Sequence, residues 1–98
     1  MRVINDQLLA NFSAIYPEAT VPLDTWLQVA KQARWKHLFD IKITWNRATD
    51  DVDGKTVFNI GGNKYRLIAT INYKLGIVKI DYILTHQEYN RGNWKTNS

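Results

Sequence analysis

The stretch TVFNIGGNKYRLIATINY, residues 56–73, decides the fold. From Thr56 onward the period of the sequence changes from helical to two, which predicts strands over 56–60 and 64–73, because successive side chains of a strand point to opposite faces of a sheet. Between them, Gly61-Gly62-Asn63 supplies residues that tolerate the positive φ of a tight hairpin turn. One face of the longer strand is predicted to carry Tyr65, Leu67, Ala69, Ile71 and Tyr73, and the other Lys64, Arg66, Ile68, Thr70 and Asn72.

The chain after this hairpin keeps the same two-residue period. Gly76 marks a second turn, and residues 77–84 are predicted as a third strand. From Thr85 onward the sequence is polar, basic and aromatic. Thr85 either caps a short helix, with Glu88 completing a capping box, or begins a tail.

The chain before the hairpin has helical spacing instead. Asn5 is predicted to cap a helix that Pro17 stops, and Pro22 is predicted as the first residue of a second helix. The apolar stripe of that helix comprises Leu23, Trp26, Leu27, Ala30 and Ala33. Residues 41–45 alternate as in a strand, although a short helix is also possible, and residues 50–54 are expected to form a polar loop or turn. Helices followed by an antiparallel sheet predict an α+β fold, in one domain spanning residues 1–98.

The composition excludes several classes of protein. The chain has 98 residues with no cysteine, which excludes a disulfide framework, a thiolate metal site and a cysteine nucleophile. With only two histidines a structural zinc site is not expected. No apolar run approaches the roughly 18 residues of a membrane span, and the first residues do not form a signal peptide. We therefore expect a soluble cytoplasmic protein with no metal and no membrane partner.

The charge is unevenly distributed along the chain. Residues 55–98 hold seven Lys or Arg against two Asp or Glu, whereas residues 1–54 hold six against seven. Such asymmetry is typical of a surface that faces a polyanion, because Lys and Arg neutralise phosphates. A solvated basic face without a ligand explains the charges equally well.

Five residues of the C-terminal half could carry chemistry. Arg66, in the middle of a strand, either grips a phosphate through its planar fork or simply faces solvent. His86 is the side chain best suited to proton transfer near neutral pH, and a helix after Thr85 would place Tyr89 on the same face. Trp94 beside Lys95 either stacks on a base or plugs the edge of the core. From these residues alone we can infer nucleic-acid binding, but we cannot infer catalysis.

Most of the chain resembles the HigB family of bacterial toxins, in the RelE-like superfamily. The resemblance is carried by Val57–Ile68, by Ile71-Asn72-Tyr73, by Leu84–Tyr89, and by the upstream Pro22-Leu23, Trp26, Trp35 and Asp40-Ile41-Lys42. The segment Gln87-Glu88-Tyr89-Asn90 departs mildly from the Ala-Glu-Tyr-Asp more common in the family.

The resemblance implies N-terminal helices packed on a twisted antiparallel sheet, with a short C-terminal helix or tail. It implies an endoribonuclease that cleaves messenger RNA, usually on the ribosome, by metal-independent attack of the ribose 2′-hydroxyl and without a cofactor. It implies an antitoxin partner, typically a helix-turn-helix protein. Arg66, His86 and Tyr89 are then the expected catalytic residues. The expected RNA-binding residues are Lys64, Lys74, Arg91, Trp94 and Lys95. Two alternatives on the same fold are a non-catalytic RNA-binding module and a domain that binds only the antitoxin.

Overall fold

A computed structural model of the protein describes residues 1–45, 49–92 and 94. Over these residues the strands β1 (Arg2–Ile4), β2 (Thr49–Val52), β3 (Lys55–Ile60), β4 (Tyr65–Asn72) and β5 (Ile77–Thr85) form one sheet in the order β1-β5-β4-β3-β2. The helices are α1 (Gln7–Ile15), the 3-10 helix Pro17–Ala19, α2 (Thr20–Gln32), α3 (Leu38–Thr44) and α4 (His86–Arg91). The predicted α+β class is confirmed.

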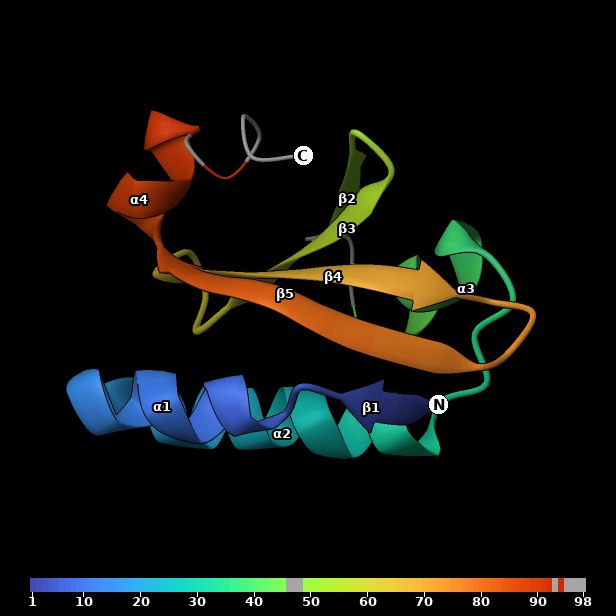
Figure 1. Ribbon diagram of the computed structural model, residues 1–98, viewed down its shortest axis with the longest axis horizontal. Coiled ribbons are helices and arrows are strands. Elements are labelled where there is room, and N and C mark those ends of the chain that lie inside the picture. The colour runs from blue at the N-terminus through green and yellow to red at the C-terminus, as the bar shows by residue number, and fades with distance from the viewer. Residues whose placement is uncertain (46–48, 93, 95–98) are drawn as a thin grey trace.

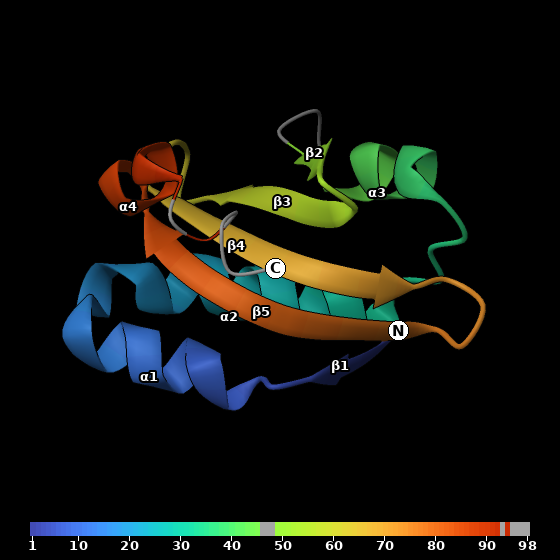
Figure 2. The same cartoon turned by 45° about the horizontal axis from the view of Figure 1, so that its top comes forward.

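The helices α1 and α2 lie side by side against one face of the twisted sheet, and α4 stands at the opposite face (Figures 1 and 2). The main core fills the space between α1, α2 and the sheet. Its largest fully buried side chains include Trp26 of α2 and Phe58 and Leu67 of the sheet. Apolar stripes on helix and strand therefore determine which sheet face becomes the interior.

The predicted hairpins are confirmed by the strand pairing. β3 pairs antiparallel with β4, and β4 pairs antiparallel with β5. Gly61 and Gly62 both have positive φ, of 63° and 73°, as the turn between β3 and β4 requires. Along β4 the predicted faces are kept, with Leu67 and Ala69 in the main core and Ile68 on the other side. The alternation is interrupted in β5, which contributes one extra residue, Asp81, opposite Ile68 and Ala69.

The N-terminus differs from the prediction. Residues 2–4 form an edge strand, β1, that runs parallel to β5, so the sheet is mixed and not wholly antiparallel. The N-cap of α1 is Asp6 and not Asn5. Asn5 instead lies in the turn that joins β1 to α1, with a φ of +66°, which asparagine adopts more readily than most residues. Its side-chain amide donates a hydrogen bond to the Ile80 carbonyl at 3.2 Å.

Two further boundaries are corrected. α1 ends before Pro17 as predicted, but the chain continues at once in a 3-10 turn, and α2 begins at Thr20, so Pro22 is its third residue. This is still within the first turn, where the missing N–H of proline costs nothing. Of the two interpretations of residues 41–45, the helix is right, as α3. Of the loop or turn predicted at 50–54, a tight turn is present at Asp53 and Gly54, whereas residues 50–52 belong to strand β2.

A smaller core covers the sheet face that α1 and α2 leave open. Val57 of β3, Ile68 of β4 and Trp94 are buried together, with Tyr82, Leu84 and Tyr89 packed around them. Of the two interpretations of Trp94, this burial, with 4% of the residue exposed, favours the plug over a base-stacking surface. Within the described residues, no helix is long and apolar enough to cross a membrane.

Candidate active site

Arg66 lies on the face of β4 that is turned away from α1 and α2. Only 7% of the residue is exposed, so the prediction that it simply faces solvent is wrong. Its Nη1 donates to the backbone carbonyls of Asn63 at 3.3 Å and Tyr65 at 3.1 Å. Its Nη2 donates to the Asn63 side-chain oxygen at 2.6 Å. The turn between β3 and β4 thus holds the guanidinium in one orientation.

α4 brings the second predicted residue to this arginine. Thr85 caps the helix, and the predicted capping box with Glu88 is present in both directions, at 2.9 and 3.2 Å. The backbone N–H of His86 donates to the Lys64 carbonyl at 2.9 Å, which joins the start of α4 to the turn before β4. Strand and helix therefore meet at one corner of the sheet.

The imidazole of His86 contacts both the arginine and an asparagine. Its Nδ1 lies 3.1 Å from Arg66 Nη2, and its Nε2 lies 3.2 Å from the side-chain amide of Asn90. A guanidinium only donates hydrogen bonds, so Nδ1 must accept and the proton of the neutral ring must be on Nε2. Asn90 accepts that proton through Oδ1 once its amide is turned by half a rotation, since amide oxygen and nitrogen are assigned from the hydrogen-bond network.

Tyr89 forms the other wall around the arginine. The centre of the guanidinium lies 5.4 Å from the centre of the Tyr89 ring, within the range of a cation–π contact. Trp94 stacks on the outer part of this arrangement, with ring centres 5.5 Å apart and planes at 17° to Tyr89. The three predicted catalytic residues are thus in one cluster, although they come from a strand and a helix.

The electrostatics of the cluster favour an incoming anion. Among the described residues, no carboxylate forms an ion pair with Arg66. Burial lowers the pKa of the Arg66 guanidinium, partly opposed by the nearby Tyr89 hydroxyl. Arginine nevertheless stays protonated in proteins. A buried cation without a counter-ion is costly, and a phosphate would relieve that cost.

A groove of about 510 Å³ opens beside His86. Lys64 and Arg91 line it, so two of the predicted RNA-binding residues lie next to the cluster. Glu88 also lines the groove, but its carboxylate serves the capping box. Tyr16 of the segment after α1 reaches the same groove and adds an aromatic ring to its wall.

Two predicted RNA-binding residues are not brought to this corner. Lys74 lies in the turn between β4 and β5, at the opposite end of β4 from Arg66. Lys95 lies outside the described residues. Sequence reasoning also missed Asn63 and Asn90, which hold the arginine and the histidine. The only available signal was spacing, since Asn63 precedes Arg66 by three residues and Asn90 follows His86 by four.

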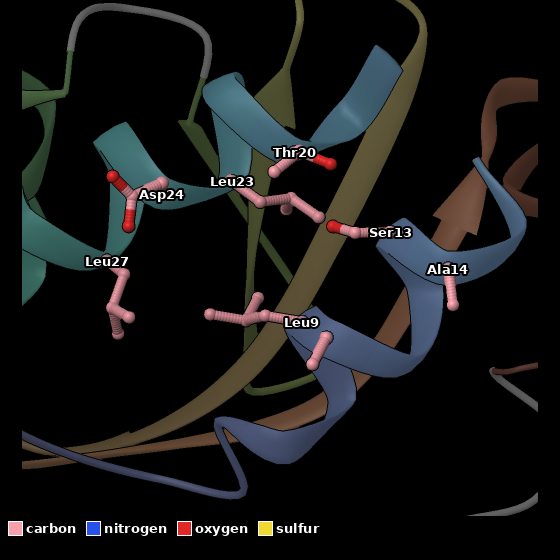
Figure 3. A pocket seen from close by; sticks show the side chains of 8 residues that line it. Leu9, Ser13, Ala14, Thr20, Leu23, Asp24 and Leu27 are labelled. Carbon is pink, nitrogen blue, oxygen red and sulfur yellow. The ribbon is translucent and has the colours of Figure 1, made fainter. Parts of the chain in front are cut away.

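An apolar groove of about 410 Å³ lies between α1 and α2, on the helical layer of the molecule. Leu9 of α1 and Leu23 and Leu27 of α2 project into it (Figure 3). Asp24, also of α2, is a polar residue of the lining. No member of the Arg66 cluster lines it. Among the described residues, no three His, Asp or Glu side chains gather as a metal site would require.

Comparison with known proteins completes this picture. A family model for HigB toxins, described as the RelE-like toxic component of a toxin–antitoxin system, matches residues 19–92, well over half of the chain. No curated protein matches it closely enough to add a named relative. The matched region contains the whole Arg66–His86–Tyr89 cluster and excludes β1 and α1. The chain therefore belongs to the HigB family and is a RelE-like toxic component of a toxin–antitoxin system.

Proposed function

We propose that the protein is an endoribonuclease that cleaves messenger RNA at the corner formed by Arg66, His86 and Tyr89. The observation that carries this proposal is the contact between Arg66 and His86. A buried guanidinium without a carboxylate partner is suited to bind a phosphate, and the group that touches it is the side chain best suited to accept a proton.

The reaction requires no metal in this proposal. The ribose 2′-oxygen attacks the adjacent phosphorus, the bond from phosphorus to the 5′-oxygen breaks, and the products end in a 2′,3′-cyclic phosphate and a 5′-hydroxyl. The 2′-hydroxyl gives its proton to a base, and the leaving 5′-oxygen takes one from an acid. Negative charge grows on the phosphate oxygens, where the Arg66 guanidinium stabilises it.

The resting contacts of His86 suggest how binding prepares the base. Nδ1 is occupied by Arg66 in the free protein, so its lone pair is not open to a substrate. A phosphate would compete for Nη2, because a charge-assisted bond to phosphate is stronger than one to a neutral ring nitrogen. Withdrawal of Nη2 frees Nδ1 to accept the 2′-hydroxyl proton. The resulting imidazolium, or the Tyr89 hydroxyl, then supplies the proton for the 5′-oxygen.

The neighbouring residues have supporting roles in this proposal. Lys64 and Arg91 raise the positive potential of the groove, and phosphates of the flanking nucleotides lie there. Trp94 supports Tyr89 by stacking and does not contact RNA itself. The substrate is messenger RNA on the ribosome, which places the protein in the cytoplasm, and the antitoxin is a helix-turn-helix protein.

The test is cleavage of a messenger RNA by the purified protein, with and without translating ribosomes, and chemical mapping of the cut ends. We expect ribosome-dependent cuts that end in a cyclic phosphate. Arg66→Ala and His86→Ala should lose them, whereas Lys42→Ala, an exposed cation of α3, should not. Absence of cleavage under both conditions by folded protein would contradict the proposal.

A further inference from the structure

A second basic groove, of about 290 Å³, lies at the end of the sheet opposite to α4. Three separate segments form it, namely the chain start at Met1, the segment after α2, and the turn between β4 and β5. Its lining residues are Met1, Ala33, Arg34, Trp35, Lys36, Tyr73, Lys74, Leu75 and Gly76. Lys74, the predicted RNA-binding residue that lies far from the active-site corner, is therefore part of the lining of this groove.

The cations of this groove have no ionic partner in the part of the chain that the structure describes. Arg34, Lys36 and Lys74 are all exposed, and none forms a salt bridge among the described residues. No carboxylate lines the groove. Asp40 is near, but its carboxylate accepts a hydrogen bond from the Lys36 backbone N–H at 2.9 Å and does not line the cavity. The result is a concave surface with three positive charges.

The sheet connects this groove to the active-site corner. Asn72, at the end of β4, lies six residues from Arg66, or roughly 20 Å along a strand. Between them Lys55 and Lys79 lie on the sheet face that α1 and α2 leave open, each within 4 Å of Asp81, at 3.0 and 3.6 Å. Because both lysines share the single carboxylate of Asp81, they add a net charge of +1 to the surface between Arg66 and Lys74.

The composition of the groove favours nucleic acid over protein as its ligand. The centres of protein–protein interfaces are depleted of charged residues, whereas nucleic-acid interfaces are strongly positive. Here the groove lining combines three charged side chains with two aromatic ones, the buried Trp35 and the half-buried Tyr73, and a base can stack on the exposed part of Tyr73. Leu75, 67% exposed, is the one large apolar side chain that the groove presents to solvent.

We propose that this groove, through Arg34, Lys36 and Lys74, is a second contact for the phosphate backbone of the RNA whose scissile bond lies at Arg66. The proposal rests on the proposed function, because it takes RNA as the ligand. It assigns the groove to positioning a long RNA, and not to the reaction itself.

The test compares two double variants of equal charge. Arg34→Gln with Lys74→Gln removes two cations of the groove, and Lys31→Gln with Lys42→Gln removes two exposed cations outside it. The probe is a fluorescent 2′-O-methyl RNA of about 20 nucleotides, longer than the roughly 4–16 nucleotides that one single-strand site occupies. It lacks the 2′-hydroxyl nucleophile and stays intact. Its Kd is measured over a series of salt concentrations, after thermal unfolding has shown that both variants fold.

The expected result is a difference in salt dependence. Each phosphate contact to a single strand contributes about 0.7 to the slope of log K against log salt, so the groove variant should lose roughly 1.4 from the slope. The matched variant should keep the wild-type slope. Equal slopes for the two variants would overturn the proposal. So would tight binding of polyglutamate that only the groove variant loses, because the groove would then serve an acidic protein.

Failure of the proposed function gives a different pattern. If the wild type binds the probe and the groove variant loses slope, but no messenger RNA is cut, the second contact holds and catalysis does not. If RNA is cut and the slopes are equal, catalysis holds and the second contact does not.

Discussion

Replacement of His86 by alanine and by asparagine separates its two proposed tasks, which are to accept a hydrogen bond from Arg66 and to move a proton. In His86→Asn the side-chain oxygen is bonded to Cγ, as Nδ1 is in histidine, so it can accept from Nη2 over nearly the same 3.1 Å. It cannot take up a proton at neutral pH. His86→Ala loses both abilities.

The two variants should therefore differ in stability but not in cleavage. Loss of a general acid–base group lowers the rate by about 10²–10⁴, so both variants should lose cleavage by that factor. A hydrogen bond to a charged group contributes about 1.5 kcal/mol at the lower end, which suits this partly buried contact. His86→Ala should lose that much, which lowers Tm by roughly 6–12 °C in a domain of this size. His86→Asn should lose less than half of it.

The assay is single-turnover cleavage of ribosome-bound messenger RNA, together with thermal unfolding of each protein by circular dichroism. Lys42→Ala serves as the control for handling and folding. Cleavage by His86→Asn within a few-fold of the wild type would refute the reasoning, because His86 would then act only by positioning Arg66. Equal loss of Tm in both variants would show that the Arg66 contact does not depend on the acceptor at Nδ1.

Three further predictions concern stability. Burial alone would raise the pKa of Asp81, but hydrogen bonds from Thr70 and Lys55, and the charges of Lys55 and Lys79, outweigh it and lower the pKa. Because the folded-state pKa is depressed, the stabilisation is present above the unfolded value of about 3.9 and is lost as the pH falls through the lower folded value. The free energy of unfolding of Asp81→Asn should thus fall less steeply below about pH 4 than that of the wild type, and parallel curves from acid titrations would contradict this. Trp94→Ala should lower the free energy of unfolding, measured in urea, by about 3–5 kcal/mol, because it leaves the smaller core uncovered, and Trp94→Phe should recover part of that loss. A loss below about 1 kcal/mol for Trp94→Ala would mean that Trp94 does not close this core. Gly61→Ala and Gly62→Ala both place a side chain at positive φ, at a cost of about 1–2 kcal/mol. Gly61→Ala should lower Tm further, because its Cβ would lie 3.3 Å from the Tyr65 ring whereas that of Gly62 meets nothing within 4 Å; a larger effect at Gly62 would oppose this.

The sequence predicted the parts of the fold that are set by local patterns. The period of two over residues 56–60 and 64–73 follows from which side chains must face the helices, and a register slip would expose Phe58 and Leu67. The capping box at Thr85 is predictable for the same reason, since both of its partners lie within four residues of sequence.

The parts that could not be predicted depend on contacts between distant residues. β1 has three residues, too few for a period, and it pairs with residues about 75 positions later. The Met1 amino group further fixes it to the end of α2, where it donates to the carbonyls of Ala30, Lys31 and Ala33. Charge counting grouped Lys74 with Lys64, but β4 separates them by its whole length, and composition carries no information on which end of a strand a charge occupies.

The sheet face that α1 and α2 leave open has to cover its apolar residues and yet leave the proposed phosphate site accessible, and α4 with Trp94 satisfies both requirements. Val57 and Ile68 must be covered, because apolar residues at the centre of a sheet are costly to expose to water. Under the proposed function, Arg66, two residues before Ile68 on the same face, has instead to stay within reach of a phosphate. A long helix across this face would bury both. The six-residue α4 covers only the corner, and Trp94 closes the apolar part through the Tyr89 stack, so the groove beside His86 stays open. The same Tyr89 ring that supports the cover contacts the guanidinium, and mutations that loosen the small core should therefore also disturb the orientation of Arg66.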